Sequence, residues 1–114
     1  MASGKENIAR NVSNYMKIFD INQVQLAEAL NCSNTTVSMW IRGNSFPRIE
    51  KIDAMCEIFG CTRADLLAEK IKTPEQAHQE KLQNVFIRRF KKLSPEQQLD
   101  LLSYMDSITS KGGD

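Results

Sequence analysis

Apolar residues recur at intervals of three and four along most of the chain, a spacing that is typical of helices with one buried face. No stretch alternates apolar and polar residues strictly enough to predict a strand. Five short helices are therefore expected within residues 1–69. Their inward positions are expected to be Ile8, Val12, Tyr15, Met16 and Phe19; Leu26, Ala27 and Leu30; Val37, Trp40 and Ile41; Ile49, Ile52, Met55, Cys56 and Phe59; and Leu66 and Leu67.

Residues that favour helix starts and helix ends separate these five segments. Four segments follow a residue whose side-chain oxygen can accept a backbone N–H. These residues are Ser3, Asn22, Ser33 and Thr62. Four segments end at a residue that tolerates the left-handed conformation of many helix ends. These are Asp20, Asn31, Gly43 and Gly60. Tight turns join the segments, so a compact all-α domain is predicted over residues 1–69, which we call the headpiece.

Residues 70–114 are interpreted as a linker and a C-terminal helical region. The stretches TPEQ (residues 73–76) and SPEQ (residues 94–97) each combine a capping hydroxyl, proline at the first helical position and glutamine at the third. Each stretch therefore predicts a helix start. Both helices are amphipathic. Their apolar stripes are Leu82, Val85, Phe86, Phe90 and Leu93, and Leu99, Leu102, Met105 and Ile108.

Length and composition are those of a small globular protein. With 114 residues, 41% of them apolar, the chain is long enough for one domain with its own core and an appendage. No apolar run approaches the ~20 residues of a membrane span, and the N-terminal residues lack the apolar stretch of a signal peptide. We therefore expect a cytoplasmic protein without a membrane contact.

Residues suited to chemistry are few. Cys32, Cys56 and Cys61 lie among apolar residues and are interpreted as reduced thiols in or near the core. The single histidine, His78, lies in a polar segment, so the two closely spaced cysteines lack the further ligands of a zinc site. Neither a nucleophile signature nor a phosphate-binding glycine loop is present. We expect no enzyme activity, no catalytic residue, no metal and no cofactor.

The distribution of charge indicates one segment of interest. The net charge of +1 neither favours nor excludes a nucleic-acid partner. From Ala29 to Ile49, however, the sequence contains no acidic residue, while Arg42 and Arg48 are both present. If the protein binds DNA, this window is the expected contact.

Within this window, the segment NCSNTTVSMW (residues 31–40) begins a helix with poor helix formers. Val37 and Trp40 are expected to face the core. Four residues then point outward, mostly in the first half of the helix. They are Asn34, Thr35, Ser38 and Met39. A solvated helix start would explain such residues without a function, and a binding surface is the alternative.

The segment INQVQLAEALNCSNTTVSMWIRGNSFPRIEKIDAMCEIFGCTRADLL (residues 21–67) closely resembles the lambda-repressor-like helix-turn-helix domain of the Cro/repressor or XRE type. The resemblance covers roughly residues 7–69 and includes N-Q-x-x-L-A, S-x-x-x-V-S-x-W, R-G and a terminal L-L. It implies a five-helix domain whose third helix enters the major groove of double-stranded DNA, while the second lies over the backbone.

The same resemblance implies two groups of DNA-binding residues. Base edges are expected to be read by Asn34, Thr35 and Met39, with Ser38 and Thr36 at the bases or the neighbouring sugar-phosphate edge. Phosphates are expected to be bound by Asn22, Gln23, Arg42, Asn44 and Arg48.

Two features depart from the family pattern. Met16 and Ile41 stand where many members have a buried arginine and glutamate, and a matched apolar replacement of such a pair can be neutral or stabilising. Asp20 and Asn31 stand in place of common glycines and still permit left-handed geometry at some cost. We interpret both departures as variants of the core and turns.

The C-terminal helices are expected to bring two copies together. One headpiece offers too few contacts for tight, selective binding at cellular salt, and family members commonly bind pseudo-palindromic operators as dimers. We therefore predict a homodimer that forms through residues 75–108. Folding of these helices back onto their own headpiece is the alternative.

The expected function is that of a sequence-specific transcriptional regulator, a repressor of phage or bacterial type. The alternative is a protein-interaction module with the same headpiece, such as an antitoxin whose C-terminal helices bind a protein partner.

Overall fold

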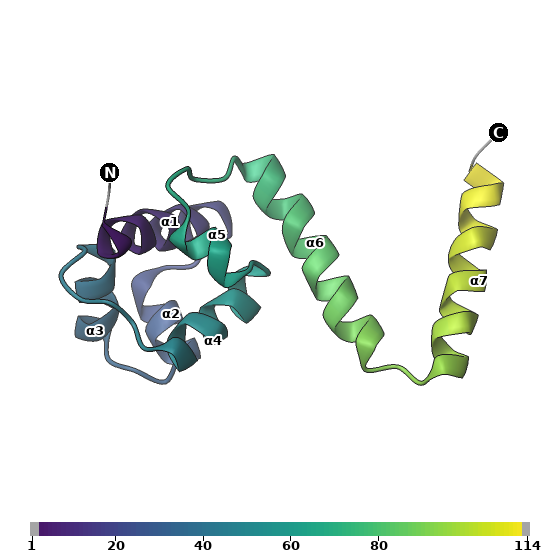
Figure 1. Cartoon of the computed structure of the whole chain (residues 1–114), viewed down its shortest axis with the longest axis horizontal. Coiled ribbons are helices and arrows are strands. Elements are labelled where there is room, and N and C mark those ends of the chain that lie inside the picture. Colours follow the sequence, from purple (N-terminus) through teal and green to yellow (C-terminus); the bar gives the residue numbers. More distant parts are fainter. Residues whose placement is uncertain (1–2, 113–114) are drawn as a thin grey trace.

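The computed structural model describes residues 3–112, which form seven helices and contain no strand (Figure 1). The all-α prediction is confirmed. Within the described range, no helix is both long enough and apolar enough to span a membrane. The helices are α1 (Gly4–Ile18), α2 (Gln23–Ala29), α3 (Asn34–Ile41), α4 (Ile49–Phe59), α5 (Arg63–Leu67), α6 (Pro74–Lys91) and α7 (Pro95–Gly112).

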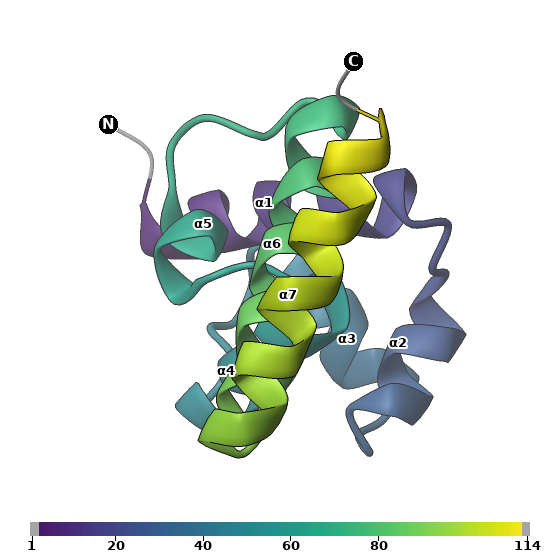
Figure 2. The ribbon, with the colours of Figure 1, turned by 90° about the vertical axis from the view of Figure 1, so that its right-hand side faces the viewer.

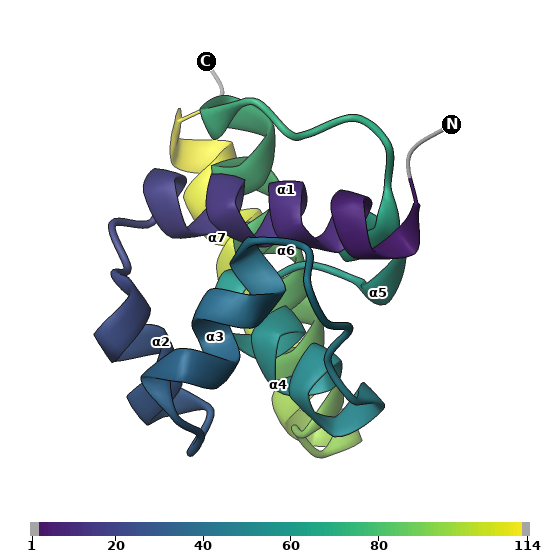
Figure 3. The ribbon, with the colours of Figure 1, turned by 90° about the vertical axis from the view of Figure 1, so that its left-hand side faces the viewer.

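The hydrophobic core lies mainly among α1 to α5. α1 packs against α3 and α5, α2 packs against α3, and α4 packs against α5 (Figure 3). Trp40 is buried, as expected. Ile49 and Leu67, which were also expected inward, are instead 51% and 40% exposed. Each is the terminal residue of its helix, where neighbouring turns no longer cover the side chain.

The helix starts and ends predicted from the sequence are confirmed. A side-chain oxygen at each start accepts the backbone N–H three residues further on, at Ser3, Asn22, Ser33, Thr62, Thr73 and Ser94. The chain adopts positive φ values at Asp20 (53°), Asn31 (54°), Gly43 (75°) and Gly60 (65°). These short-range interactions define the turns on which the packing of the headpiece depends.

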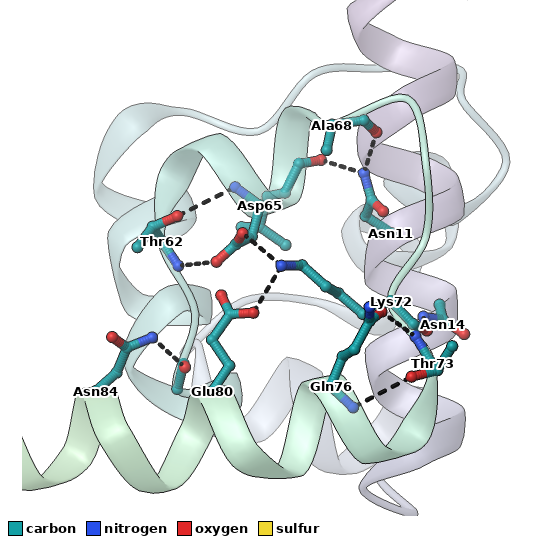
Figure 4. Close-up of polar contacts among 12 residues, drawn as sticks. Asn11, Asn14, Thr62, Asp65, Ala68, Lys72, Thr73, Gln76, Glu80 and Asn84 are labelled. Carbon is teal, nitrogen blue, oxygen red and sulfur yellow. Dashed lines mark hydrogen bonds and ion pairs between the residues drawn. The ribbon is translucent and has the colours of Figure 1, made fainter.

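Two asparagines of α1 hold the segment that follows α5 (Figure 4). The buried Asn11 donates from Nδ2 to the carbonyls of Leu66 and Ala68, at 2.9 and 2.7 Å. Asn14, one turn later, donates to the carbonyl of Lys72 at 2.8 Å. The connection between α5 and α6 is therefore fastened to the headpiece.

One face of α6 packs on the headpiece. Ala77 is buried in the core cluster, and Asn84 and Arg88 donate to backbone carbonyls at the end of α4, at distances of 2.7 to 3.3 Å. Positions 77, 80, 84 and 88 share one side of the helix because they are three or four residues apart. This face of α6 thus folds back onto the headpiece, while its opposite face does not.

Lys72 links α5 and α6 through an ion cluster (Figure 4). Its Nζ lies 3.3 Å from Asp65 Oδ1 and 2.7 Å from Glu80 Oε2. Burial, followed by the hydrogen bond with Asp65, raises the pKa of Glu80 above its ordinary value of 4.5. Burial opposes ionisation of Asp65, but hydrogen bonds from Glu80 and Thr62 hold the pKa of Asp65 below its ordinary value.

Replacing Lys72 with methionine is expected to destabilise the protein at neutral pH, because two carboxylates then face each other without a cation. The pKa of Glu80 should rise further. A carboxyl with a raised folded-state pKa contributes stability below its unfolded-state pKa, and this contribution is lost as the pH rises through the folded-state value. The deficit of Lys72→Met in free energy of unfolding, relative to the wild type, should therefore shrink as the pH falls toward about 4.5. Urea unfolding of both proteins over this pH range measures it, with Lys70→Met as the exposed control. A deficit that is independent of pH would contradict the expectation.

α7 extends away from the headpiece. It is joined to α6 by a short turn; it lies in front of α6 in Figure 2, and Figure 1 shows the two helices diverging from the turn. Four apolar residues of its stripe are between 39% and 66% exposed. They are Leu99, Leu102, Met105 and Ile108. In the single chain this stripe therefore faces the solvent.

Candidate nucleic-acid interface

The connection between α2 and α3 sets the angle at which α3 is presented. The chain reverses at Asn31, and the Cys32 N–H donates to the carbonyl of Ala27 at 3.0 Å. Ala27 is buried, and its small side chain allows α3 to pack closely against α2. Val37 and Trp40 attach α3 to the core, which leaves the other side of α3 to the solvent.

The first turn of α3 is built around Ser33. Its Oγ accepts the Thr36 N–H at 3.1 Å, and the two hydroxyls are also hydrogen-bonded to each other at 2.8 Å. Thr36 is half-buried. Of the five residues expected at base edges, Thr36 is therefore the one whose hydroxyl takes part in the helix start.

A shallow hollow of about 350 Å³ opens on the outward face of α3. It brings together four of the residues expected at base edges and two of those expected at phosphates. Asn34 and Thr35 are exposed, and Met39 is 42% exposed. The lining residues are Gln23, Asn34, Thr35, Ser38, Met39 and Arg42.

Gln23 connects the starts of the two helices. Its Nε2 donates to the backbone carbonyl of Asn34 at 3.0 Å, across eleven positions of sequence. The side chain therefore positions the first turn of α3 while it lines the hollow. The resemblance implied only a phosphate contact for this residue, and no local sequence signal indicates the link to Asn34.

Asn22 forms the reciprocal cap predicted for α2. Its Oδ1 accepts the Gln25 N–H at 2.8 Å, and Gln25 Oε1 accepts the Asn22 N–H at 2.9 Å. Because the cap uses the oxygen of the exposed Asn22 side chain, its NH₂ group is the part suited to donate to a phosphate.

Arg42, Asn44 and Arg48 follow α3 and are all exposed. Arg42 is the C-terminal cap residue of α3 and reaches the hollow. The Asn44 N–H donates to the carbonyl of Met39 at 2.9 Å, which holds the loop on the end of α3. Arg48 precedes α4 and makes no side-chain capping bond. Neither α2 nor α3 has an acid in its first turn, so this edge favours an anionic partner.

Lys51 is a positioning residue that the sequence analysis missed. From α4, its Nζ donates to the carbonyl of Leu30 at 2.5 Å and so secures the end of α2. A lysine on a mixed helix gives no local signal of such a contact. Asn11 and Asn14 did carry a signal, because two amides three residues apart share one face of α1.

Two apolar residues that replace a buried ion pair, and the three cysteines, lie in or beside the core. Met16 and Ile41 are partly buried and pack against the core cluster. Cys56 and Cys61 are buried, Cys32 is half-buried, and all three are free thiols. Among residues 3–112, no group of three or more His, Cys, Asp and Glu side chains could hold a metal ion.

A model of the helix-turn-helix family matches residues 14–66. This range begins within α1 and ends within α5, and it includes the hollow and all ten residues expected to contact DNA. None of the curated proteins and none of the solved structures compared with the chain matches it.

Proposed function

Residues 14–66 are a helix-turn-helix domain of the Cro/C1 type, and from this premise we propose that the protein is a sequence-specific repressor that binds a pseudo-palindromic operator as a homodimer. Domains of this type bind DNA and regulate transcription. We propose further which residues read the bases, that two copies form a dimer, and that regulation is repression.

The hollow on α3 is the observation that carries the proposal. It gathers small hydrogen-bonding side chains, one thioether and one guanidinium on a helix face that the core leaves uncovered. A major groove admits an α-helix in this orientation, with the N-terminal residues of the helix at the base edges. Asn34 and Thr35 are the first two residues of α3, which suits them to this position.

The proposed readers have chemistry that matches base edges. The Asn34 amide can make a two-point contact with N6 and N7 of adenine. The methyl groups of Thr35 and Met39 can pack against the methyl group of thymine. Asn22, Gln23, Arg42, Asn44 and Arg48 would bind the flanking phosphates, which fixes the register without reading sequence.

The groove between α6 and α7 supports the proposed dimer. It has a volume of about 690 Å³, and its walls are mainly apolar side chains of α6. Burial of such a surface with the exposed stripe of α7 gives two copies a common hydrophobic interface. The lining residues are His78, Lys81, Leu82, Val85, Phe86, Arg89, Phe90, Leu93 and Leu101.

We infer repression, and not activation, because repression needs fewer contacts with other molecules. A dimer that covers an operator excludes other proteins from the same DNA, and this action needs no contact beyond those to DNA and to the second copy. The headpiece and the groove supply both contacts, so exclusion is the simplest mode of regulation for this chain.

Selection of bound sites from a pool of random duplexes tests the proposal. The full chain should enrich one motif with two inverted half-sites whose centres are about one helical turn apart, ~34 Å. Recovery of unrelated sequences, with an affinity that depends on salt and not on sequence, would show charge-driven binding and would contradict the proposal.

The groove also favours a second candidate, a protein-interaction module such as an antitoxin. An exposed apolar groove is also a surface on which a different protein could pack. Sedimentation of the full chain at micromolar concentration separates the two candidates. A dimer favours the repressor, while a stable monomer favours a different protein in the groove.

A further inference from the structure

Two cysteines meet at the end of α4, outside the DNA-binding face. Cys56 lies in the last turn of α4, and Cys61 follows Gly60 directly. The N–H groups of Gly60 and Cys61 both donate to the carbonyl of Cys56, the latter at 3.0 Å. Gly60 adopts a φ of 65°, which turns the chain back over the helix. A helix end of this form brings the side chain that follows the left-handed residue into contact with a side chain in the last turn of the helix.

The contact is between two thiols with unequal acidity. Cys56 is 5% exposed and Cys61 is 1% exposed. The hydrogen bond from the Cys61 thiol, with a smaller contribution from the Arg88 guanidinium, lowers the pKa of Cys56. The same hydrogen bond and burial raise the pKa of Cys61. A thiolate is the reactive form of cysteine, so Cys56 is the nucleophile of the pair and Cys61 retains its proton.

A small surface pocket is lined by residues that include both cysteines. Its volume is about 370 Å³, and its walls include Cys56 and Cys61 together with Arg63 and Arg88. Thr62, Asp53 and Glu57 complete the lining. Its volume exceeds that of a hydrogen peroxide molecule, while little of either cysteine is exposed.

We propose that Cys56 and Cys61 form an oxidisable dithiol, which a hydroperoxide converts into a disulfide at the junction of α4 and α6. The Cys56 thiolate attacks the peroxide, the O–O bond breaks, and an alcohol or water leaves as Cys56 becomes a sulfenic acid. The Cys61 sulfur then attacks the Cys56 sulfur, and the hydroxyl leaves as water with the Cys61 proton. Two electrons pass from the two thiols to one peroxide.

Oxidation acts on a turn to which α6 is attached. Arg88 donates to the carbonyls of Cys56 and Cys61, at 3.3 and 3.1 Å, and Asn84 donates to the carbonyl of Gly60 at 2.7 Å. A Cβ added to Gly60 would lie 2.7 Å from the Lys81 Cα, so the two backbones are in close contact. A change in the turn is therefore transmitted to α6 and not directly to α3.

The test uses the reduced full chain, hydrogen peroxide and mass spectrometry. After oxidation and alkylation of the denatured protein, trypsin releases residues 52–63, a single peptide with both cysteines. We expect this peptide to be lighter by two hydrogen atoms and unalkylated, while Cys32 is alkylated. Cys32→Ser should behave in the same way. Sulfinic or sulfonic acid at Cys56 with a free Cys61, or disulfides between chains, would overturn the proposal.

Two variants separate the two steps of the reaction. In Cys61→Ser, the hydroxyl can still donate to Cys56, but the sulfenic acid of Cys56 has no thiol partner and should be captured by dimedone. In Cys56→Ala, Cys61 should resist peroxide, and equal reactivity of both variants would overturn the assignment of the nucleophile. Hydrogen exchange of residues 74–91 should change on oxidation of the wild type and not of Cys56→Ala. Unchanged exchange there would overturn the link to α6. Neither readout uses DNA, so the result is independent of the proposed repressor function.

Discussion

Replacing Phe86 with lysine is expected to convert the proposed dimer into monomers and to weaken binding to a palindromic operator by a factor of about 10²–10⁴. Phe86 lines the groove, is 41% exposed, and stacks on Phe90 with ring centroids 5.5 Å apart. An ammonium at this position loses hydration when a second copy covers the groove. Lys81 and Arg89 already line the groove, so the new charge also meets repulsion. Each headpiece then binds alone, without the high effective concentration that a dimer provides.

Two measurements check this expectation, namely sedimentation and titration of a full operator beside a single half-site. Phe86→Lys should sediment as a monomer and bind the half-site as the wild type does. Gln83→Lys places the same charge on an exposed position of α6 outside the groove lining, and it should remain dimeric. A dimeric Phe86→Lys protein, or equal losses on both DNA molecules, would remove the groove as the interface.

Replacing Asn34 or Thr35 with alanine is expected to abolish discrimination at one or two base pairs of each half-site. The loss should amount to about 1–3 kcal/mol for the preferred base, and much less for other bases. Both residues are exposed at the start of α3, and the Asn34 carbonyl that accepts the bond from Gln23 belongs to the backbone. The substitutions therefore leave the start of α3 intact and remove only the side chains that are proposed to face the major groove of DNA.

Arg48→Ala is the matched comparison for these two variants. Its guanidinium is expected at a phosphate, so its loss should weaken all sequences similarly and reduce the slope of log K against log salt by about one. Titrations of all three variants with the selected operator and its single-base changes, at several salt concentrations, measure both effects. Equal losses on every sequence from Asn34→Ala and Thr35→Ala would exclude these residues as base readers.

The helices and their limits were predictable because their signals are local. A cap such as Asn22 and a left-handed residue such as Asn31 act on backbone groups within a few positions. The outward face of α3 follows from the positions of Val37 and Trp40, which must be buried. Local chemistry and helical spacing therefore suffice for the elements and for the face that bears the proposed site.

The contacts that hold these elements in place were not predictable in the same way. Gln23 reaches Asn34 across eleven residues, and Lys51 reaches Leu30 across twenty-one. Such pairs depend on the angle between helices, which the spacing of apolar residues leaves open. Folding back onto the headpiece was the stated alternative, but the face of α6 that packs was not predictable, because Asn84 and Arg88 look like solvent-exposed residues until α4 is placed against them.

The fastening of the α5–α6 connection has a consequence for DNA geometry. Asn11, Asn14 and Lys72 fix this connection, and α6 itself is bonded to the end of α4. The headpiece and α6 are thus joined by contacts at several points, unlike modules on a flexible tether that adapt to many separations. In the proposed dimer, two such units would hold the two α3 helices at one separation and one relative orientation. One base pair inserted between the proposed half-sites would rotate the second site around the helix axis, so we expect the length of the operator's spacer to affect binding.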